Sequence, residues 1–143
     1  MLTCSKTYRD IPLSHRQPLH PGRCSRVHGH SWSLTLTFAA EQLDENGFVV
    51  DFGELHYLAD WIDEHLDHAT ILAASDPRLP QLKALAEDGL LKIHLVESAS
   101  CEGIARHLHE TLAPLVREHT EGRARLLAVE LHEDSRNSAR YSP

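Results

Sequence analysis

Apolar and polar residues alternate along residues 31–40, and this alternation predicts a β-strand with one buried face. The apolar face of this strand consists of Trp32, Leu34, Leu36 and Phe38. A second alternation over 125–133 predicts another strand, with the apolar face Leu127, Val129 and Leu131. Extended segments are also expected over 2–13 and 92–96, and a short returning strand over 48–50 follows a turn at 44–47.

Other stretches repeat their apolar residues every three or four positions, which is the helical period. One helix is expected over about 52–66, with Asp51 as its N-cap and the buried positions Leu55, Leu58, Ile62 and Leu66. A long helix is expected after Ser98 or Ser100, with the buried stripe Ile104, Leu108, Leu112 and Leu115. A short helix between Leu79 and Leu90, ending near Gly89, and a loop over 16–23 complete the pattern.

These elements predict an α+β fold, in which about four main strands form an antiparallel sheet and two main helices cover one of its faces. A length of 143 residues is enough for one domain, 1–143, with a hydrophobic core. No apolar run approaches the roughly 20 residues of a membrane span, and no signal peptide is visible. We therefore expect a cytoplasmic protein without membrane contact.

The charge and the cysteines narrow the function classes further. A net charge of -7 disfavours a nucleic-acid partner, because it repels the phosphate backbone. The three cysteines show no disulfide framework, which agrees with a reducing compartment. Histidine is the residue in excess, with 12 of 143, and the histidines are dispersed along the chain.

His28 and His30 flank Gly29 at the start of the strand over 31–40, and side chains two residues apart in a strand point to the same side. Catalytic zinc sites use three protein ligands and leave a fourth position open. We expect His15, at the end of the first extended segment, to be the third ligand, with His20 as the alternative. The simpler explanation is that these are polar histidines at a strand edge that are neighbours by chance.

Cys24 lies just upstream of this pair and is a candidate nucleophile or acid/base, provided that a base or a cation is close to the thiol. Asp67 and His68, at the end of the first helix, are candidates for that role, because a carboxylate can orient an imidazole. Taken alone, this pair is explained as well by a helix C-terminal histidine that the dipole favours. Cys4 and Cys101 are expected to be small buried residues.

Glu133 ends the last predicted strand. A carboxylate in that place can accept two N–H donors from a ligand such as an amino-pyrimidinone edge. A solvated acid at a strand end is the simpler explanation when the residue is considered alone.

Taken in order, these pieces resemble the 6-pyruvoyltetrahydropterin synthase / 6-carboxytetrahydropterin synthase family over nearly the whole chain. The segments that carry the resemblance are Ser14-His15-Arg16, Cys24-x3-His28-Gly29-His30, Gly47-Phe48-Val49-Val50-Asp51-Phe52, Leu66-Asp67-His68, Ser100-Cys101-Glu102, and Glu133 with Tyr141. The resemblance implies the T-fold (tunnelling fold), a four-stranded antiparallel sheet with two helices on one side. It also implies a homo-oligomer in which three subunits close a barrel and two trimers form a hexamer, with active sites at subunit interfaces.

The resemblance also implies a role for each candidate residue. By this similarity the Zn²⁺ ligands are His15, His28 and His30; the proton-transfer group is Cys24, Asp67 and His68; and the substrate-binding residues are Glu133, which anchors the pterin, and Ser100. Arg16 and Arg26 are candidate triphosphate contacts from their positions alone. The departures from the family pattern are a longer segment over 69–98, Asp134 in place of a threonine, and Ala99-Ser100 in place of Pro-Thr.

The three-residue spacer between Cys24 and His28 is similar to that of bacterial 6-carboxytetrahydropterin synthases. The implied reaction converts 7,8-dihydroneopterin triphosphate and water to 6-carboxy-5,6,7,8-tetrahydropterin, acetaldehyde and triphosphate, in the route to queuosine. The alternatives are a 6-pyruvoyltetrahydropterin synthase or another pterin side-chain lyase, and a non-catalytic binding module stabilised by zinc.

Overall fold

The sheet contains six strands in the order β4-β3-β1-β2-β5-β6. The computed structural model describes residues 1–143. The strands are β1 (Leu2–His15), β2 (His28–Ala40), β3 (Ala69–Ala73), β4 (Ile93–Val96), β5 (Ala124–His132) and β6 (Ser138–Tyr141). The pairs β1–β2, β2–β5 and β5–β6 are antiparallel, whereas β3 pairs in parallel with both β1 and β4. The predicted α+β class is confirmed, but the sheet is mixed and has more strands than the expected four.

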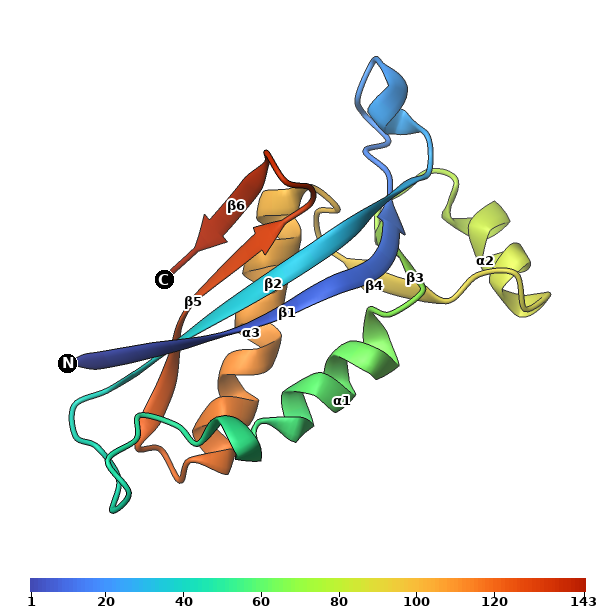
Figure 1. The fold of residues 1–143 in the computed structure, drawn as a ribbon. Helices are drawn as coiled ribbons and strands as arrows, with labels where there is room; N and C mark the ends of the chain where they lie inside the picture. The colour runs from blue at the N-terminus through green and yellow to red at the C-terminus, as the bar shows by residue number, and fades with distance from the viewer.

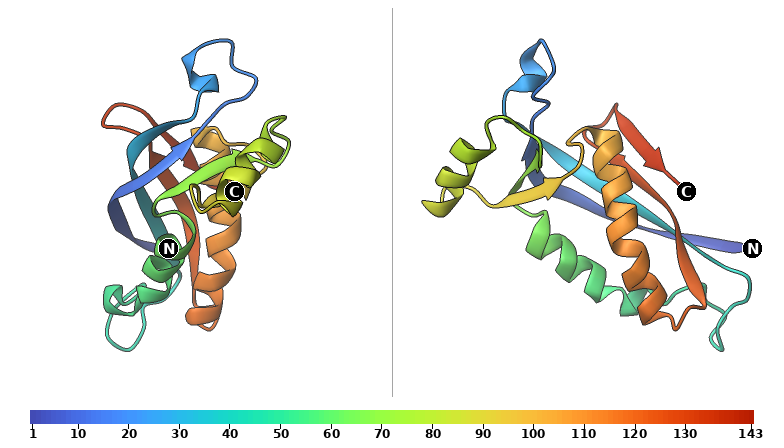
Figure 2. Two further views of the ribbon diagram at one scale, coloured as in Figure 1. Left: turned by 90° about the vertical axis from the view of Figure 1, so that its right-hand side faces the viewer. Right: turned by 180° about the vertical axis from the view of Figure 1, so that it is seen from behind.

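The helices are α1 (His56–His65), α2 (Leu79–Glu87) and α3 (Cys101–His119), with 3₁₀ turns at Arg23–Ser25 and Phe52–Glu54. Both α1 and α3 lie on the same face of the sheet, and α2 lies beyond the β4 edge (Figures 1 and 2). The first helix begins later than predicted because the Asp51 carboxylate caps the 3₁₀ turn, where it accepts from the Gly53 N–H at 2.8 Å. None of the helices combines the length and the apolar composition that crossing a bilayer requires.

The core lies between the sheet and the helices α1 and α3. The apolar face predicted for β2 is buried there, since Trp32, Leu34, Leu36 and Phe38 are all 0% exposed. Each such side chain stabilises the fold by about 1.5–3 kcal/mol relative to an exposed one. The opposite side of β1 and β2 carries hydroxyl groups, and the Thr7 and Thr35 hydroxyls hydrogen-bond at 2.8 Å. The period of two along β2 therefore separates a dry face from a polar one.

Two strands were missed and one was wrongly expected. Residues 48–50 form no strand. Every residue of β3 is buried, so this strand, which pairs in parallel on both sides, shows no alternation by which to recognise it. The four-residue β6 lies in a polar segment whose composition is typical of a tail.

Two details of the core also differ from the prediction. In β5, Leu126 rather than Leu127 is fully buried, because the pairing with β2 shifts register between Thr37 and Phe38. In α3, Val116 is buried and Leu115 only partly so.

Candidate metal-binding active site

His15, His28 and His30 come together at the ends of β1 and β2. The antiparallel register places His15 directly opposite His28, and His30 lies two residues further along β2 on the same face. The ring centroids are 4.7 Å apart for His15 and His28, and the nitrogen atoms that all three rings offer lie within 4.8 Å of one another. The predicted triad is thus assembled by strand pairing, and its geometry suits a divalent metal ion.

Hydrogen bonds to backbone carbonyls orient two of these rings. His15 donates from Nδ1 to the Ala99 carbonyl at 2.7 Å, and His28 donates from Nδ1 to the Arg26 carbonyl at 2.7 Å. A carbonyl only accepts, so Nε2 of each ring keeps its lone pair for a metal. The Nε2 atoms of His15 and His30 are buried without a hydrogen-bond partner. Unpartnered buried nitrogen is costly, and a bound cation removes that cost.

His15 is the most deeply placed member of the triad, at 1% exposure. Burial lowers the pKa of its imidazole to about 4, with smaller contributions from the neighbouring His28 and His30. The ring is therefore neutral near pH 7, which is the form that binds a metal.

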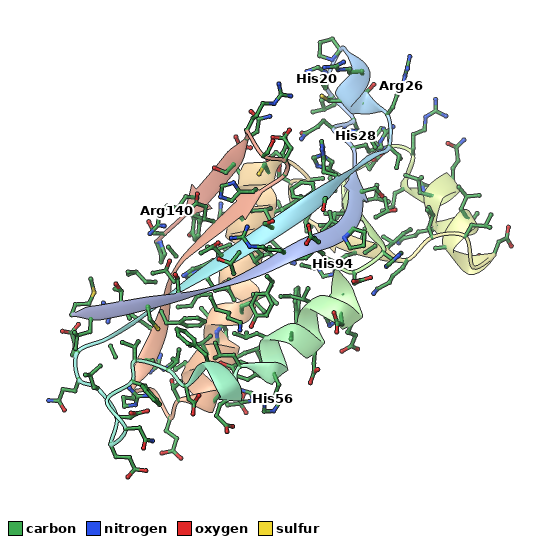
Figure 3. The ribbon with its side chains drawn as sticks, in the orientation of Figure 1. His20, Arg26, His28, His56, His94 and Arg140 are labelled. Atoms are coloured by element: carbon green, nitrogen blue, oxygen red, sulfur yellow. The ribbon has the colours of Figure 1, made fainter.

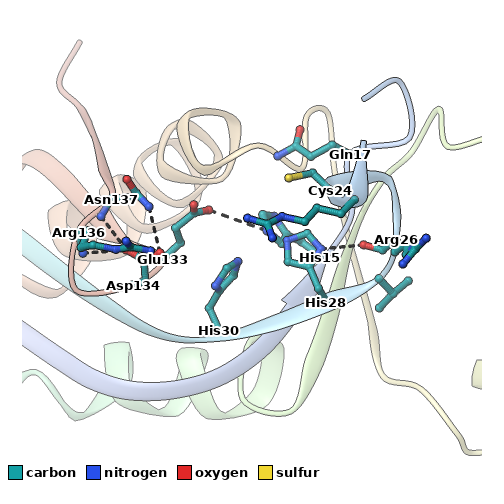
Figure 4. Close-up of a pocket in the computed structure, with 12 residues that line it drawn as sticks. His15, Gln17, Cys24, Arg26, His28, His30, Glu133, Asp134, Arg136 and Asn137 are labelled. Carbon is teal, nitrogen blue, oxygen red and sulfur yellow. Dashed lines mark hydrogen bonds and ion pairs between the residues drawn. The ribbon is translucent and has the colours of Figure 1, made fainter. Parts of the chain in front are cut away.

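A cavity of about 540 Å³ opens in front of the triad and contains Cys24, Glu133 and three arginines (Figure 4). Cys24 sits in the 3₁₀ turn Arg23–Ser25 and is partly buried. The structure therefore brings the predicted thiol and the predicted metal ligands to one cavity. The arginines that line it are Arg23, Arg26 and Arg136. None of the three forms an ion pair within the chain, so all three remain available to an anion.

Glu133 reaches the cavity from the turn between β5 and β6. Its N–H donates to the Asn137 carbonyl at 3.1 Å, which closes the turn, and its Oε2 lies 4.0 Å from Nε2 of His15. Asp134, which stands in place of a threonine, has a structural role in this turn. Its carboxylate accepts hydrogen bonds from the backbone N–H groups of Arg136 and Asn137 at 2.8 Å each. Those hydrogen bonds lower the pKa of Asp134 and stabilise the turn that carries Glu133.

Asp67 and His68 are not brought to this cavity within one chain. His68 follows α1 with a left-handed φ of 57°, and its N–H donates to the Pro12 carbonyl at 2.7 Å. This bend lets the Asp67 carboxylate hydrogen-bond to Nδ1 of His68, although neighbours on a regular helix do not face each other. The His68 side chain is 80% exposed and borders a different hollow, beside Ser14 and Thr70. The pair is therefore presented outward.

Other predicted site residues have different surroundings. His20, the alternative ligand, is exposed at the tip of the loop that Figure 3 shows, remote from His28. The hydroxyl of Ser100 accepts from the Gly103 N–H at 3.0 Å and caps α3, and Ser100 does not line the cavity. Arg16 is also outside the cavity lining, whereas Arg26 belongs to it.

Cys4 and Cys101 were expected to be buried, but both are only partly buried. Cys101 donates to the Leu131 carbonyl at 3.3 Å, and burial together with Glu133 and Glu102 raises its pKa to about 12. Its thiol is therefore protonated near neutral pH and is a poor nucleophile.

Six residues of the cavity lining were not predicted from the sequence as site residues: Gln17, Arg23, Val27, Asp134, Arg136 and Asn137. The only signal for Arg23 was its place beside Cys24. Nothing in the polar segment 134–137 indicated that a sixth strand would fold it back beside the histidines.

The fold and the cavity define an α+β protein with a three-histidine group that can hold a metal ion beside a thiol and a carboxylate. The sequence model of one family, 6-pyruvoyl tetrahydropterin synthase, matches residues 3–143. The chain belongs to this family, and the family places it among the pterin synthase enzymes.

Several relatives are named 6-carboxy-5,6,7,8-tetrahydropterin synthase. The protein of that name from Rickettsia bellii is 36% identical over 115 residues, which cover 80% of this chain and 82% of the relative. The one from Aquifex aeolicus is 31% identical over 122 residues, covering 83% of this chain and 75% of the relative.

Solved structures agree on the fold. An uncharacterized protein from Wolinella succinogenes superimposes with a TM-score of 0.83 at 21% identity, covering 99% of this chain and 97% of the other. The Caenorhabditis elegans 6-pyruvoyl tetrahydropterin synthase superimposes with a TM-score of 0.68 at 17% identity, covering 99% and 95%. The predicted T-fold is confirmed by these likenesses.

Proposed function

We propose that this chain is a zinc-dependent 6-carboxy-5,6,7,8-tetrahydropterin synthase, a lyase that acts on 7,8-dihydroneopterin triphosphate in the route to queuosine. The observation that carries the proposal is the three-histidine group with two unpartnered Nε2 atoms, in the same cavity as Cys24. The names of the relatives from Rickettsia bellii and Aquifex aeolicus support the choice of product. Three unpaired cysteines support a reducing cytoplasmic location.

His15, His28 and His30 would hold the zinc ion through Nε2. When bound, zinc supplies Lewis acidity toward the oxygens of the substrate side chain. The carbonyls of Ala99 and Arg26 keep two of the rings in the tautomer that this requires.

Cys24 is the proposed proton-transfer group from this chain, because its thiol and the triad share one cavity. Asp67 and His68 of a second copy are the proposed partners on the other side of the substrate. Their exposure supports this assignment, since a pair that points outward is available to a neighbouring subunit. The proposed assembly is the trimer-based hexamer of the family.

The cavity offers groups that would be complementary to the two ends of the proposed substrate. Arg23, Arg26 and Arg136 are the proposed contacts of the triphosphate, which needs several cations that are not already paired. Glu133 is the proposed acceptor for the N–H groups of the pterin ring. Its distance of 4.0 Å from Nε2 of His15 supports a position of the pterin ring beside the proposed metal site.

Product analysis tests the proposal. The zinc-loaded protein is incubated with 7,8-dihydroneopterin triphosphate, and acetaldehyde, triphosphate and the pterin product are measured with and without a chelator. We expect one acetaldehyde for each triphosphate released, and no turnover after the metal is removed. Triphosphate release with a 6-pyruvoyl product and no acetaldehyde would assign the alternative activity. A closed four-coordinate zinc with no turnover would indicate a binding module instead.

A further inference from the structure

Asp76 is a buried carboxylate that the proposed chemistry does not use. It lies in the turn between β3 and α2, within the segment 69–98, and its side chain is 0% exposed. Arg16 donates to it through two nitrogens, from Nε to Oδ2 at 2.7 Å and from Nη2 to Oδ1 at 3.2 Å. The Arg78 N–H also donates to Oδ1, at 2.8 Å, so the carboxylate is held both from its own turn and from the residue that follows β1. A forked, buried pair of this kind fixes orientation as well as charge.

The same guanidinium also reaches the loop that carries Cys24. Nη1 of Arg16 donates to the Ser25 carbonyl at 2.9 Å, and the N–H of Gln17 donates to the Cys24 carbonyl at 2.8 Å. Two consecutive carbonyls beside the thiol are therefore held by two consecutive residues at the end of β1.

No other hydrogen bond joins the loop of residues 17–25 to the rest of the fold. The other hydrogen bonds that residues 17–25 form stay within residues 17–26. Figure 1 shows this loop projecting beyond the sheet, where no helix covers it. Arg16 is thus the side chain that ties the loop to the rest of the fold, and Asp76 is what holds Arg16 in place.

We propose that the Arg16–Asp76 pair is a positioning device that holds the Cys24 loop against the metal centre. This proposal rests on the proposed function in one respect, namely that Cys24 transfers a proton. The geometry separates this role from a triphosphate contact, because the donors of Arg16 are directed at Asp76 and Ser25 and the side chain does not line the cavity. It also assigns a role to the long segment 69–98, because Asp76 from this segment holds Arg16.

Arg16→Lys and Asp76→Asn test the proposal, with Arg78→Lys as the matched control. A lysine keeps the charge but cannot hold a carboxylate by two nitrogens and a carbonyl by a third. The Arg78 side chain is exposed and bonds only to Gln81, at 3.2 Å, so this control changes an arginine in the same turn without touching the pair.

Hydrogen exchange of the metal-loaded protein is the first measurement. In both test variants we expect the amides of Gln17, Ser25 and Arg26 to exchange at least about fivefold faster, because the loop opens more often. The control should exchange like the unaltered protein. Unchanged protection in Arg16→Lys and Asp76→Asn would overturn the proposal.

Steady-state kinetics with a metal assay is the second measurement. We expect both variants to keep their zinc, to change KM by less than about twofold, and to lose up to about 100-fold in kcat, as a misplaced reacting group does. A raised KM at unchanged kcat in Arg16→Lys alone would make Arg16 a substrate contact. Normal kcat in both would leave the pair as a stabilising ion pair only.

A double variant keeps the test decisive if Asp76→Asn does not fold. Arg16→Met/Asp76→Asn removes both charges, so neither is left buried alone. If the two residues act as one device, the double variant loses no more kcat than the worse single variant. The hydrogen-exchange measurement needs no substrate. Absence of pterin turnover in the unaltered protein would therefore refute the proposed function, while hydrogen exchange would still test whether the Arg16–Asp76 pair holds the loop.

Discussion

At the scale of single residues, the site depends on which atom of each side chain is left free. The backbone occupies Nδ1 of His15 and His28, and the fold buries Nε2 of His15 and His30 without a partner. Cys24 differs from the other two cysteines in that its thiol shares the cavity with these nitrogens. The metal site and the thiol therefore allow separate tests.

Removing one ligand should abolish metal binding. We expect His28→Ala to weaken zinc binding by more than about 100-fold, which exceeds the usual effect of losing an outer hydrogen bond to a ligand. The measurement is zinc content after dialysis against a competing chelator, together with turnover. His20→Ala, in the exposed loop tip, is the matched control and should keep a full complement of metal. Retained zinc in His28→Ala would refute the triad.

Removing the thiol should separate metal binding from turnover. We expect Cys24→Ala to keep its zinc and to lose at least about 100-fold in kcat, the contribution of a positioned acid/base group. Cys4→Ala, on β1 outside the cavity, serves as the control for loss of a thiol. Near-normal turnover in Cys24→Ala would show that the thiol takes no part in the reaction.

At the scale of elements, α3 makes two junctions, one with the site and one with β4. The start of α3 carries Ala99, whose carbonyl orients His15, and Ser100, which caps the helix. The packing of β4 against α3 brings His94 and His107 together, with their Nε2 atoms hydrogen-bonded at 2.9 Å. The first junction orients a histidine of the triad, whereas the second makes stability depend on pH.

The first junction is sensitive to one added methyl group. A Cβ at Gly103 would lie 2.4 Å from the Ser98 carbonyl oxygen, so the segment 98–100 has to move. We expect Gly103→Ala to cost about 1–3 kcal/mol of unfolding free energy, as overpacking does, and also to weaken zinc binding because Ala99 moves with the segment. Ser100→Ala, which removes the cap and the 3.1 Å hydrogen bond to the Ser98 hydroxyl but adds no atom, should cost about 1 kcal/mol and leave zinc affinity unchanged. Denaturant titration and zinc competition measure the two effects, and equal zinc affinity in both variants would contradict the link.

The second junction predicts loss of stability in acid. Burial, followed by the nearby His107, His65 and Lys92, lowers the pKa of His94 to about 4. The unfolded chain has the ordinary value of about 6.5, so it binds more protons than the folded chain between these two values. The free energy of unfolding should therefore fall as pH decreases from about 6.5 to about 4.

The test compares His94→Phe with His20→Phe by urea titration across that range of pH. His94→Phe should show a shallower loss of stability, whereas His20→Phe should follow the unaltered protein. Equal slopes in all three proteins would remove His94 from the acid response.

At the scale of the whole molecule, the residues proposed for proton transfer lie in two separate places on the chain. Cys24 lies in the cavity, whereas His68, which is hydrogen-bonded to Asp67, is exposed and borders another hollow of the sheet. The uncovered face of the sheet is polar, with a hollow that no hydrophobic residue lines. These features agree with the shared site that the proposed assembly requires.

Mixing two inactive variants tests the shared site. Cys24→Ala and His68→Ala are each expected to be inactive, but after joint unfolding and reassembly about a quarter of the interfaces should combine the two intact groups. Activity of the mixture is measured against each variant treated alone. A mixture that stays inactive, although size exclusion shows reassembled oligomers, would place the whole site within one chain.

The sequence alone determined the strands and helices whose apolar period is clear, such as β2 and α3, since one-sided burial imposes a period of two or of about 3.6. It also determined that His28 and His30 share one side, because alternation in a strand directs residues two positions apart to the same face. Position along the predicted strands and loops made His15, Cys24 and Glu133 candidates, and the resemblance to a known family then implied a role for each. Apolar periodicity and strand alternation are local properties of the sequence, and the roles of the site residues follow from short family motifs.

Only the tertiary structure decided what depends on contacts between distant segments. β3 has no alternation because its residues are all buried, and β6 is recognisable only through its pairing with β5. Arg16 was expected to face the substrate, yet it pairs with Asp76, sixty positions along the chain. Such outcomes follow from which segments the sheet places side by side, because a polar side chain takes the partner that the fold brings within hydrogen-bond distance, and no local pattern encodes that partner.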